Sequence, residues 1–460
     1  MDKIENIYFV GIGGIGMSAI ARHFNALGKK VAGYDRTQTE LTNEIAAEGI
    51  EITFDDNVDT IPAPFKDKTK TIIVITPAIP ADNAIRCYFE QGDFTIMKRA
   101  AMLGKLTSMA SAICIAGTHG KTTTSTMTAH IMRNANVGCS AFLGGVSANY
   151  NTNYWSDTQS SFVVTEADEY DRSFLHLHPY LSLVTAMDAD HLDIYGTHEE
   201  ITKAFHQFAS QTEVGGAVVY KHELDFDETV VDEDCEIFTY SLNDNEADYY
   251  AFGIKMQGAR TTFSLQTPFG TIRNIELGIP GLHNVENAVA ASALSLIAGV
   301  EEEELVAALK TFKGNRRRFQ YRIDEADYCL IDDYAHHPEE IRSMLVSLRQ
   351  MYKERKITVV FQPHLYTRTR DFADDFAEVL SMADRVILLD IYPARELPIE
   401  GVTSEMLLRK MQGTDAMLSS KEELFDNIVS RPLDVLVMMG AGNIDAMVGS
   451  IEQQLRTYKK

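Results

Sequence analysis

The sequence predicts an α/β protein of three domains, and three observations carry that prediction. Short β-branched runs alternate with helix-compatible segments along most of the chain, which is the pattern of parallel sheets with crossover helices. At 460 residues, 45% of them apolar, the chain exceeds what one hydrophobic core usually organises. Two glycine-rich segments each stand between an apolar run and a helical pattern. We therefore expect domains at residues 1–106, 107–314 and 315–460.

The first domain is expected to be Rossmann-like. An apolar run at Ile7–Val10 leads into the segment GIGGIG, and a helix is expected to open near Met17. Glycines at such a turn let the backbone approach a pyrophosphate, which makes ligand-binding candidates of Gly11, Gly13, Gly14 and Gly16. Asp35 follows nineteen residues after the last of them, the usual distance for an acid that reaches a ribose. Both a nicotinamide dinucleotide and a UDP-sugar fit this pattern.

The central domain is expected to be a P-loop ATPase. The strand-like run Ala112–Ala116 precedes the segment GTHGKT, and a helix-compatible stretch follows to about Met132. Lys121 is positioned to reach the terminal phosphates of ATP, and the Thr122 hydroxyl is positioned to ligate magnesium. The loop is shorter than the general signature, because Ile115 stands where its first glycine is expected. The remaining ATP-binding candidates are its neighbours Gly117, Thr118, His119, Gly120 and Thr123.

Acidic residues follow the next two apolar strands of this domain. One cluster begins at Glu166, and a second includes Asp188, Asp190 and Asp193. Because carboxyl ends of parallel strands are where ligands bind, both clusters are expected beside the lysine loop. One carboxylate and a threonine hydroxyl suffice as a protein shell for Mg²⁺. Glu166 is the first candidate ligand, and His191, lying among the aspartates, is the next.

Two further regions complete the fold prediction. Short alternating runs between Gly215 and Leu277 predict an antiparallel addition to the central sheet. After Lys313, four apolar runs predict a third, Rossmann-like domain with strands at Cys329–Ile331, Thr358–Phe361, Val386–Leu389 and Val435–Met439. The run of three arginines at 316–318 fits either a solvated linker or a ligand contact at the domain junction.

Composition limits the function classes. A net charge of −24 and a pI near 4.9 argue against nucleic acid as a routine partner. We find no apolar run near eighteen residues and no signal-like N-terminus, so neither membrane spanning nor secretion is expected. Five scattered cysteines favour a reducing cytoplasm. The oligomeric state stays open.

Taken together, the motifs resemble those of the ATP-dependent Mur ligases of peptidoglycan precursor synthesis. The resemblance runs along nearly the whole chain. It rests on ordered motifs that include AGTHGKTTT at 116–124, EADEYDRSFL at 166–175, PGLHNVENAVAA at 280–291, GNRRRF at 314–319 and FQPHLYTRTRDF at 361–372.

The resemblance implies a division of labour between the domains. A UDP-sugar would bind the first domain, ATP the second, and the third would close over both. Within the family the motifs favour the step that joins L-alanine to the lactyl carboxylate of UDP-N-acetylmuramate through an acyl phosphate. Lys121 would contact phosphates, while Thr122, Glu166 and His191 would hold Mg²⁺. The residues implied to meet adenosine are Asn284, Asn287, Arg318 and Asp333. Those implied near the sugar nucleotide, the reacting carboxylate or the amino acid are Arg99, Tyr334, His336 and Arg368, with His336 as a candidate base.

Three positions depart from the family pattern. Several relatives carry a carbamylated lysine where this chain has His206, so that feature is not expected here. Leu365 stands where related ligases often show arginine, and Ala101 stands where many show glutamate. Substrate contacts near these two positions are therefore open.

Other functions fit parts of the sequence. A recycling ligase of the same superfamily, which attaches a ready-made peptide to the same sugar nucleotide, shares the motifs. A nicotinamide-dependent oxidoreductase accounts for the first glycine loop and leaves the second unexplained. A nucleotide-gated regulatory protein would use the second loop without forming product.

Overall fold

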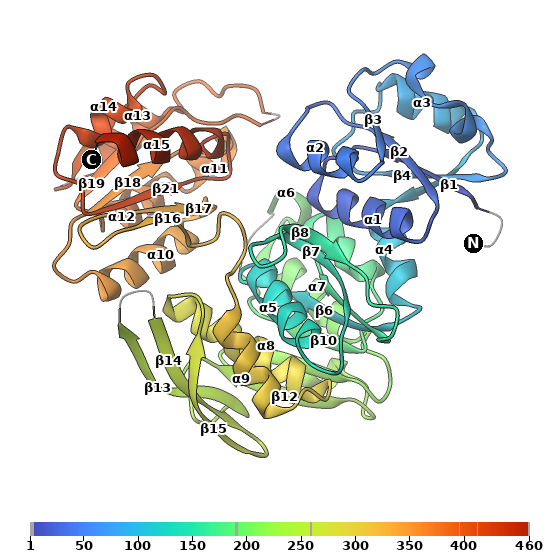
Figure 1. Cartoon of the computed structure of the whole chain (residues 1–460), viewed down its shortest axis with the longest axis horizontal. Coiled ribbons are helices and arrows are strands. Elements are labelled where there is room, and N and C mark those ends of the chain that lie inside the picture. The colour runs from blue at the N-terminus through green and yellow to red at the C-terminus, as the bar shows by residue number, and fades with distance from the viewer. Residues whose placement is uncertain (1–3, 189–191, 258–259, 395, 412, 459–460) are drawn as a thin grey trace. The chain divides into compact units, whose positions relative to one another are not determined.

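The computed structural model covers the chain and describes all residues except 1–3, 189–191, 258–259, 395, 412 and 459–460 (Figure 1). It contains three β-sheets flanked by helices, which confirms the predicted α/β class. The chain forms two compact units. The first comprises Met1–Phe252, Ser264–Ile275 and Glu286–Lys313, and the second Gly253–Phe263, Glu276–Val285 and Gly314–Lys460.

The first sheet is parallel, with strand order β3-β2-β1-β4-β5. Its strands are β1 (Asn6–Val10), β2 (Lys30–Tyr34), β3 (Glu51–Thr53), β4 (Thr71–Ile75) and β5 (Thr95–Lys98). Its helices are α1 (Ile15–Ala26), α2 (Glu40–Ala47), α3 (Ala84–Gln91) and α4 (Arg99–Thr107), with 3-10 turns η1 (Val58–Thr60) and η2 (Ala63–Lys66). Every residue of β1 is buried, and the strand order reverses there. The crevice at the carboxyl end of β1 is therefore where a ligand is expected.

The second sheet has ten strands in the order β15-β14-β13-β12-β11-β10-β6-β9-β7-β8. Its strands are β6 (Ser111–Ala116), β7 (Ser140–Ser147), β8 (Thr152–Trp155), β9 (Phe162–Glu166), β10 (Leu181–Val184), β11 (Ala217–Lys221), β12 (Glu236–Ser241), β13 (Tyr249–Gln257), β14 (Arg260–Thr267) and β15 (Gly270–Leu277). Its helices are α5 (Lys121–Arg133), α6 (Leu192–Tyr195), α7 (His198–Ala209), α8 (Leu282–Ile297) and α9 (Glu302–Thr311), with 3-10 segments η3 (Tyr170–His176) and η4 (Glu228–Val230). Strand β6 lies between β10 and β9 and is parallel to both.

The antiparallel prediction for residues 215–277 is wrong for its first strands. Strand β11 is parallel to β10, β12 is parallel to β11, and β12 pairs parallel with β13. The connection from β11 to β12 is long enough for a parallel crossover and contains η4. Only two residues connect β14 to its neighbour β15, too few for a parallel crossover, so the prediction holds for that pair.

The third sheet has the order β16-β17-β21-β18-β19-β20. Its strands are β16 (Gln320–Asp324), β17 (Cys329–Asp333), β18 (Ile357–Phe361), β19 (Arg385–Leu388), β20 (Asp415–Leu418) and β21 (Val435–Met439). Its helices are α10 (Pro338–Met351), α11 (Tyr366–Asp371), α12 (Ala373–Leu380), α13 (Ser404–Lys410), α14 (Leu424–Val429) and α15 (Asp445–Tyr458). The four predicted strands are present, and the edge strands β16 and β20 were not predicted. Strand β16 is antiparallel to β17, whereas the other pairs are parallel.

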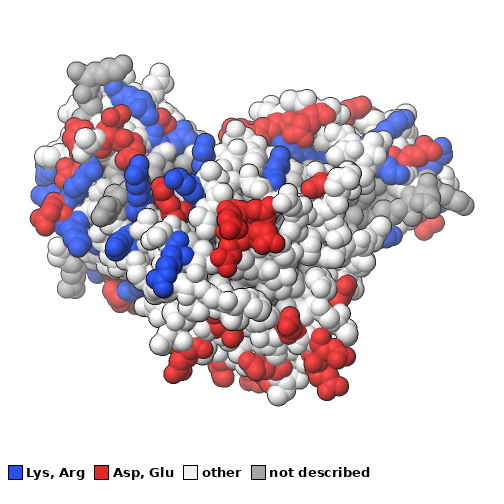
Figure 2. All heavy atoms as spheres, turned by 60° about the horizontal axis from the view of Figure 1, so that its bottom comes forward, with Lys and Arg blue, Asp and Glu red and all other residues white. Residues whose placement is uncertain are grey.

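Two surface properties bear on function. Within the described part of the chain, no helix combines the length and apolar character needed to cross a bilayer. On the face shown in Figure 2, clusters of Asp and Glu are prominent, and Lys and Arg are interspersed with other residues.

Candidate active site

The first glycine loop presents backbone amides at the start of α1. Gly11 has a φ of +95°, a left-handed conformation that favours glycine, and its N–H donates to Tyr34 O at 2.8 Å. Gly14 caps the helix without any side-chain cap. The first-turn amides of a helix that lacks such a cap are suited to an anion.

Asp35, which follows β2, hydrogen-bonds the first glycine loop. Its Oδ2 accepts the Gly13 N–H at 2.7 Å, and its Oδ1 accepts the Thr37 N–H at 3.1 Å. A Cβ at position 13 would lie 2.8 Å from Asp35 Oδ2, which explains the glycine there. The structure thus gives Asp35 a role in shaping the loop, and contact with a ribose stays a prediction.

The second glycine loop follows β6 and wraps around a lysine. Gly117 and Gly120 have φ values of +130° and +81°, and a Cβ on Gly117 would overlap Thr185. Lys121 is the first residue of α5, and its Nζ donates to Gly117 O at 2.7 Å. The backbone and the lysine are arranged as in a phosphate-binding loop, and phosphate binding itself stays a prediction.

A buried carboxylate accompanies the lysine. Both oxygens of Glu169 lie within hydrogen-bonding distance of Lys121 Nζ, at 2.9 and 2.8 Å, and the Glu169 side chain is 1% exposed. Burial alone would lower the pKa of Lys121, but the charges of Glu169, Glu166 and Asp168 outweigh it and raise that pKa. Lys121 is therefore a permanent cation. The sequence placed Glu169 in the acidic cluster without giving it this role.

Glu166 and Thr122 are arranged to supply two oxygen ligands to a metal ion. The Thr122 hydroxyl hydrogen-bonds the Glu166 carboxyl, whose pKa is raised by burial despite the nearby Lys121. Glu166 Oε2 is buried and has no hydrogen-bond donor among the described residues. Gly144 of β7 faces it, and a Cβ at that position would overlap the carboxylate. A buried oxygen without a donor, beside a hydroxyl, fits Mg²⁺.

The second acidic cluster lies at the same edge of the sheet, as predicted. Thr118 Oγ1 donates to Asp188 Oδ2 at 3.2 Å, and His119 Nε2 lies 3.6 Å from the same oxygen. The predicted metal ligand His191 lies outside the described residues, as does Asp190.

Helix α8 brings an amide to the second loop. Asn287 Oδ1 accepts from Thr124 Oγ1 at 3.2 Å, and a Cβ on Gly120 would lie 2.8 Å from it. Asn284, one turn earlier, is buried and donates to Pro280 O at 2.5 Å. Thr123 is half-buried in the first turn of α5.

A pocket connects the first loop to the Glu166 cluster. Its lining includes Gly16 of α1, Arg99 of α4, Gly144, Glu166 and Asp168. Arg99 packs against the first loop, because a Cβ on Gly16 would lie 2.8 Å from its Nη1, and its Nη2 donates to Asp168 at 3.1 Å. A ligand whose phosphates lie at the first loop can thus extend toward Glu166.

The second unit carries the remaining predicted residues. Asp333 is buried at the end of β17 and accepts the N–H groups of Phe319 at 2.6 Å and Ala335 at 2.7 Å. Burial raises the pKa of Asp333, although Arg318 opposes the shift. The Arg318 guanidinium lies 5.1 Å from the centre of the Tyr334 ring. The arginine run therefore packs on the site of this unit rather than forming a solvated linker.

His336 lies in the loop after β17, and Arg368 lies on α11, the helix that follows β18. His336 Nδ1 lies 3.0 Å from Tyr334 O and 3.2 Å from Glu340 Oε2. Both are acceptors, so Nδ1 is the ring nitrogen positioned to donate, and Nε2 faces neither of them. Arg368 lies on α11, whose N-cap Leu365 has the unusual φ of +70°. Among the described residues, no side-chain partner of the Arg368 guanidinium is found.

Three family models of the Mur ligases match this chain. The family's catalytic domain matches residues 6–110, the middle domain residues 115–295, and the glutamate ligase domain residues 317–442.

Full-length relatives are similar as well. The UDP-N-acetylmuramate–L-alanine ligase of Porphyromonas gingivalis strain W83 is 47% identical over 455 residues, covering 99% of this chain and all of that protein. The enzyme of the same name from Phocaeicola vulgatus is 44% identical, covering 98% of both chains. Among solved structures, UDP-N-acetylmuramate-alanine ligase from Thermotoga maritima matches with a TM-score of 0.83 and 27% identity, covering 98% of this chain and 99% of that one.

Proposed function

The chain belongs to the Mur ligase family, and on that premise we propose that it joins L-alanine to the carboxylate of UDP-N-acetylmuramate with conversion of ATP to ADP and phosphate. The observation that carries the proposal is the pocket that connects the first glycine loop to Glu166 and Asp168. It runs from Gly16 and Arg99 to Glu166, the path that a sugar nucleotide with a reactive carboxylate needs. The proposed location is the cytoplasm, where ATP is available and the five unpaired cysteines stay reduced.

In the first half-reaction, the lactyl carboxylate oxygen attacks the γ-phosphorus of ATP. A P–O bond forms, the bond to ADP breaks, and an acyl phosphate results. Gly117 to Thr123 hold the phosphates, and Lys121 stabilises the negative charge on the transferred group. Thr122 and Glu166, with His191 as a further candidate, would hold Mg²⁺, which would supply charge neutralisation at the phosphates. Arg99 orients the sugar nucleotide at the pocket.

In the second half-reaction, the L-alanine amine attacks the acyl carbon. The C–N bond forms, the intermediate collapses with loss of phosphate, and the nitrogen gives up a proton. His336 Nε2 is the proposed acceptor of that proton, because Nδ1 is committed to Tyr334 O and Glu340. The Arg368 guanidinium has no side-chain partner in the part of the chain that the structure describes, and we propose that it binds near the reacting carboxylate and the amino acid. Asn284, Asn287, Arg318 and Asp333 are the proposed adenosine contacts.

The test is the mass of the product after incubation with ATP, Mg²⁺ and UDP-N-acetylmuramate, offering equal L-alanine and tripeptide. We expect the sugar nucleotide to gain one alanine residue, with one ADP formed per product. ADP formation without sugar nucleotide or amino acid would contradict the ligase reaction. Selective addition of the tripeptide would identify a recycling ligase, and a change at the reduced-nicotinamide absorbance band would indicate an oxidoreductase.

A further inference from the structure

Helix α1, which begins at the first glycine loop, packs on strands β7 and β8 of the second sheet. Residues Ile15, Ser18 and Arg22 follow the helical spacing of three and four, so they share one face. Asn153 of β8 lies against this face, because its side chain hydrogen-bonds Ile15 and Ser18. The contact therefore joins the phosphate-binding helix of the first sheet to the edge strand of the second.

Asn153 is fully buried and uses both ends of its amide. Its Nδ2 donates to Ile15 O at 2.6 Å and to Ser18 Oγ at 2.9 Å. Its Oδ1 accepts from the Arg22 guanidinium. Since Ile15 is the first residue of α1, these bonds hold the helical turn that carries the anion-binding amides.

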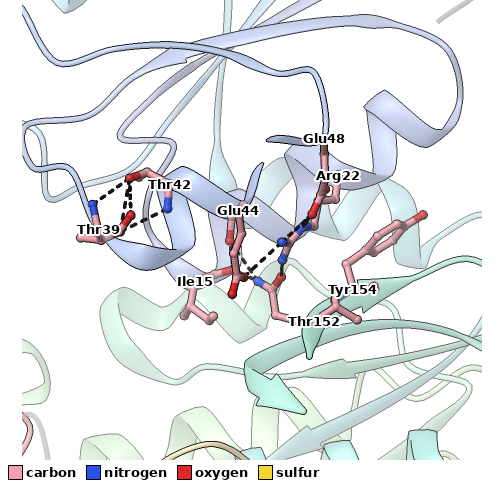
Figure 3. A network of polar contacts seen from close by, with 10 residues as sticks. Ile15, Arg22, Thr39, Thr42, Glu44, Glu48, Thr152 and Tyr154 are labelled. Atoms are coloured by element: carbon pink, nitrogen blue, oxygen red, sulfur yellow. Dashed lines mark hydrogen bonds and ion pairs between the residues drawn. The ribbon is translucent and has the colours of Figure 1, made fainter. Parts of the chain in front are cut away.

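Arg22 is 5% exposed and links three elements. Its Nε donates to Glu48 Oε1 at 2.9 Å, its Nη2 donates to the same oxygen at 2.7 Å, and Glu44 of α2 lies 3.5 Å away. A buried guanidinium is tolerated only when it is fully paired. The position of Arg22 is therefore determined by Glu44 and Glu48 on one side and by Asn153 of β8 on the other. Glu44 and Glu48 therefore hold the Arg22 guanidinium in place (Figure 3). The same guanidinium donates to Asn153 Oδ1.

We propose that Arg22 and Asn153 form a latch that positions the first glycine loop relative to the phosphoryl-transfer site. Strand β8 pairs with β7, and β7 carries Gly144, which abuts Glu166. The latch therefore connects the first turn of α1 to Glu166 through two adjacent strands. Because Asn153 is fully buried and Arg22 is 5% exposed, we assign them the role of positioning residues, and this role rests on the proposed ligase function.

The principal test is Asn153→Asp, which keeps an acceptor for Arg22 and removes both donors to α1. We expect kcat for ADP formation to fall on the order of 10-fold to 100-fold, since displacement of about 1 Å between reacting groups costs that much. The KM for ATP should stay within about 2-fold, because the second loop is untouched. The matched control is Asn149→Asp, which loses a donor to Thr311 O within the central region and should keep kcat within about 2-fold.

Two further measurements keep the latch testable if Asn153→Asp folds poorly. Ser18→Ala removes the hydroxyl that accepts from Asn153 Nδ2 and donates to Ile15 O, and it should lower kcat about 3-fold with no change in the KM for ATP. The single tryptophan, Trp155, lies two residues along β8 from Asn153, so its fluorescence should respond to UDP-N-acetylmuramate in the wild type and lose that response in Ser18→Ala.

The outcomes separate the two proposals. A wild-type protein that forms no amide overturns the ligase function, whereas the fluorescence response to sugar nucleotide still tests the latch. An active wild type together with a folded Asn153→Asp variant of unchanged kcat overturns the latch. A lowered melting temperature with unchanged kcat per folded molecule also overturns it, because that is the signature of a purely structural contact.

Discussion

The two glycine loops share a backbone plan and differ in charge. Each follows a buried strand and opens a helix without a side-chain cap. In the first loop the nearest carboxylate, Asp35, accepts a backbone N–H of the loop itself. In the second, Lys121 is embedded between Gly117 O and the carboxylate of Glu169, with Glu166 beside it.

This difference indicates different tasks for similar turns. A loop of amides alone can hold a pyrophosphate whose bonds do not change. A loop with a fixed cation and a carboxylate for a metal can stabilise charge that moves during phosphoryl transfer. The glycine pattern therefore predicts phosphate binding. The charged side chains around the loop predict whether the bound phosphate is transferred. Four substitutions test this assignment.

The largest effect is expected at Lys121. Lys121→Ala removes the cation from the second loop and should lower kcat by about 1,000-fold or more, as removal of a main electrostatic stabiliser does. ADP release in the presence of all three substrates measures it. Lys203→Ala, at an exposed lysine of α7, is the control and should retain activity. Undiminished turnover in Lys121→Ala would assign the chemistry elsewhere.

Glu166→Gln should have the next largest effect. The amide keeps the size of the side chain and weakens its interaction with a divalent cation, so we expect about a 100-fold loss of kcat and a higher Mg²⁺ requirement. Titration of activity with MgCl₂ checks both. A variant with an unchanged Mg²⁺ dependence would show that Glu166 does not contribute to metal binding.

A smaller effect is expected at Asp35. Asp35→Asn weakens the bond to the Gly13 N–H without removing a group that takes part in the reaction. We expect the KM for UDP-N-acetylmuramate to rise about 10-fold while kcat changes less than about 3-fold. Steady-state kinetics with sugar nucleotide as the varied substrate decides the matter. A large loss of kcat at unchanged KM would contradict the conclusion that the first loop binds its ligand without taking part in the reaction.

The smallest effect on activity at neutral pH is expected at two histidines on the helices that follow the loops. Burial lowers the pKa of His23 on α1 and of His130 on α5 to about 4. Because the unfolded chain binds the proton more readily, each histidine destabilises the fold as pH falls from about 6.5 toward 4, by up to about 3 kcal/mol. His23→Gln should flatten the decline of the melting temperature over this range and leave activity at pH 7.5 within about 2-fold. An equally steep decline of the melting temperature in the variant would show that protonation of His23 does not destabilise the fold.

The sequence predicted the loops well because their determinants are local. A glycine run after an apolar strand and before a helix specifies the strand, turn and helix within a few residues, and Lys121 follows directly, whereas phosphate binding there stays a prediction. The acids at strand ends were also placed correctly, since parallel strands bring their carboxyl ends to one edge. Strand direction from β11 to β13 was not predicted, because it depends on how the connecting segments cross over rather than on the strand residues.

Partnerships between distant residues were harder to infer. Nothing in the local sequence says that Gly144 must lack a side chain because Glu166 occupies that space, or that Asn153 reaches the first turn of α1. Glu169 could have been suspected, since it lies three residues after Glu166 in a segment dense in acids. Its role beside Lys121 still required the geometry of the loop.

The pairing of Lys121 with Glu169 has a consequence for inhibitor design. The ammonium group already has an anionic companion before any nucleotide arrives, so a competing compound must displace that carboxylate to gain from the lysine. Uncharged compounds aimed at the second loop should derive their affinity from the adenosine contacts alone. Compounds that bear a phosphonate or a similar dianion can replace the Glu169 carboxylate beside Lys121.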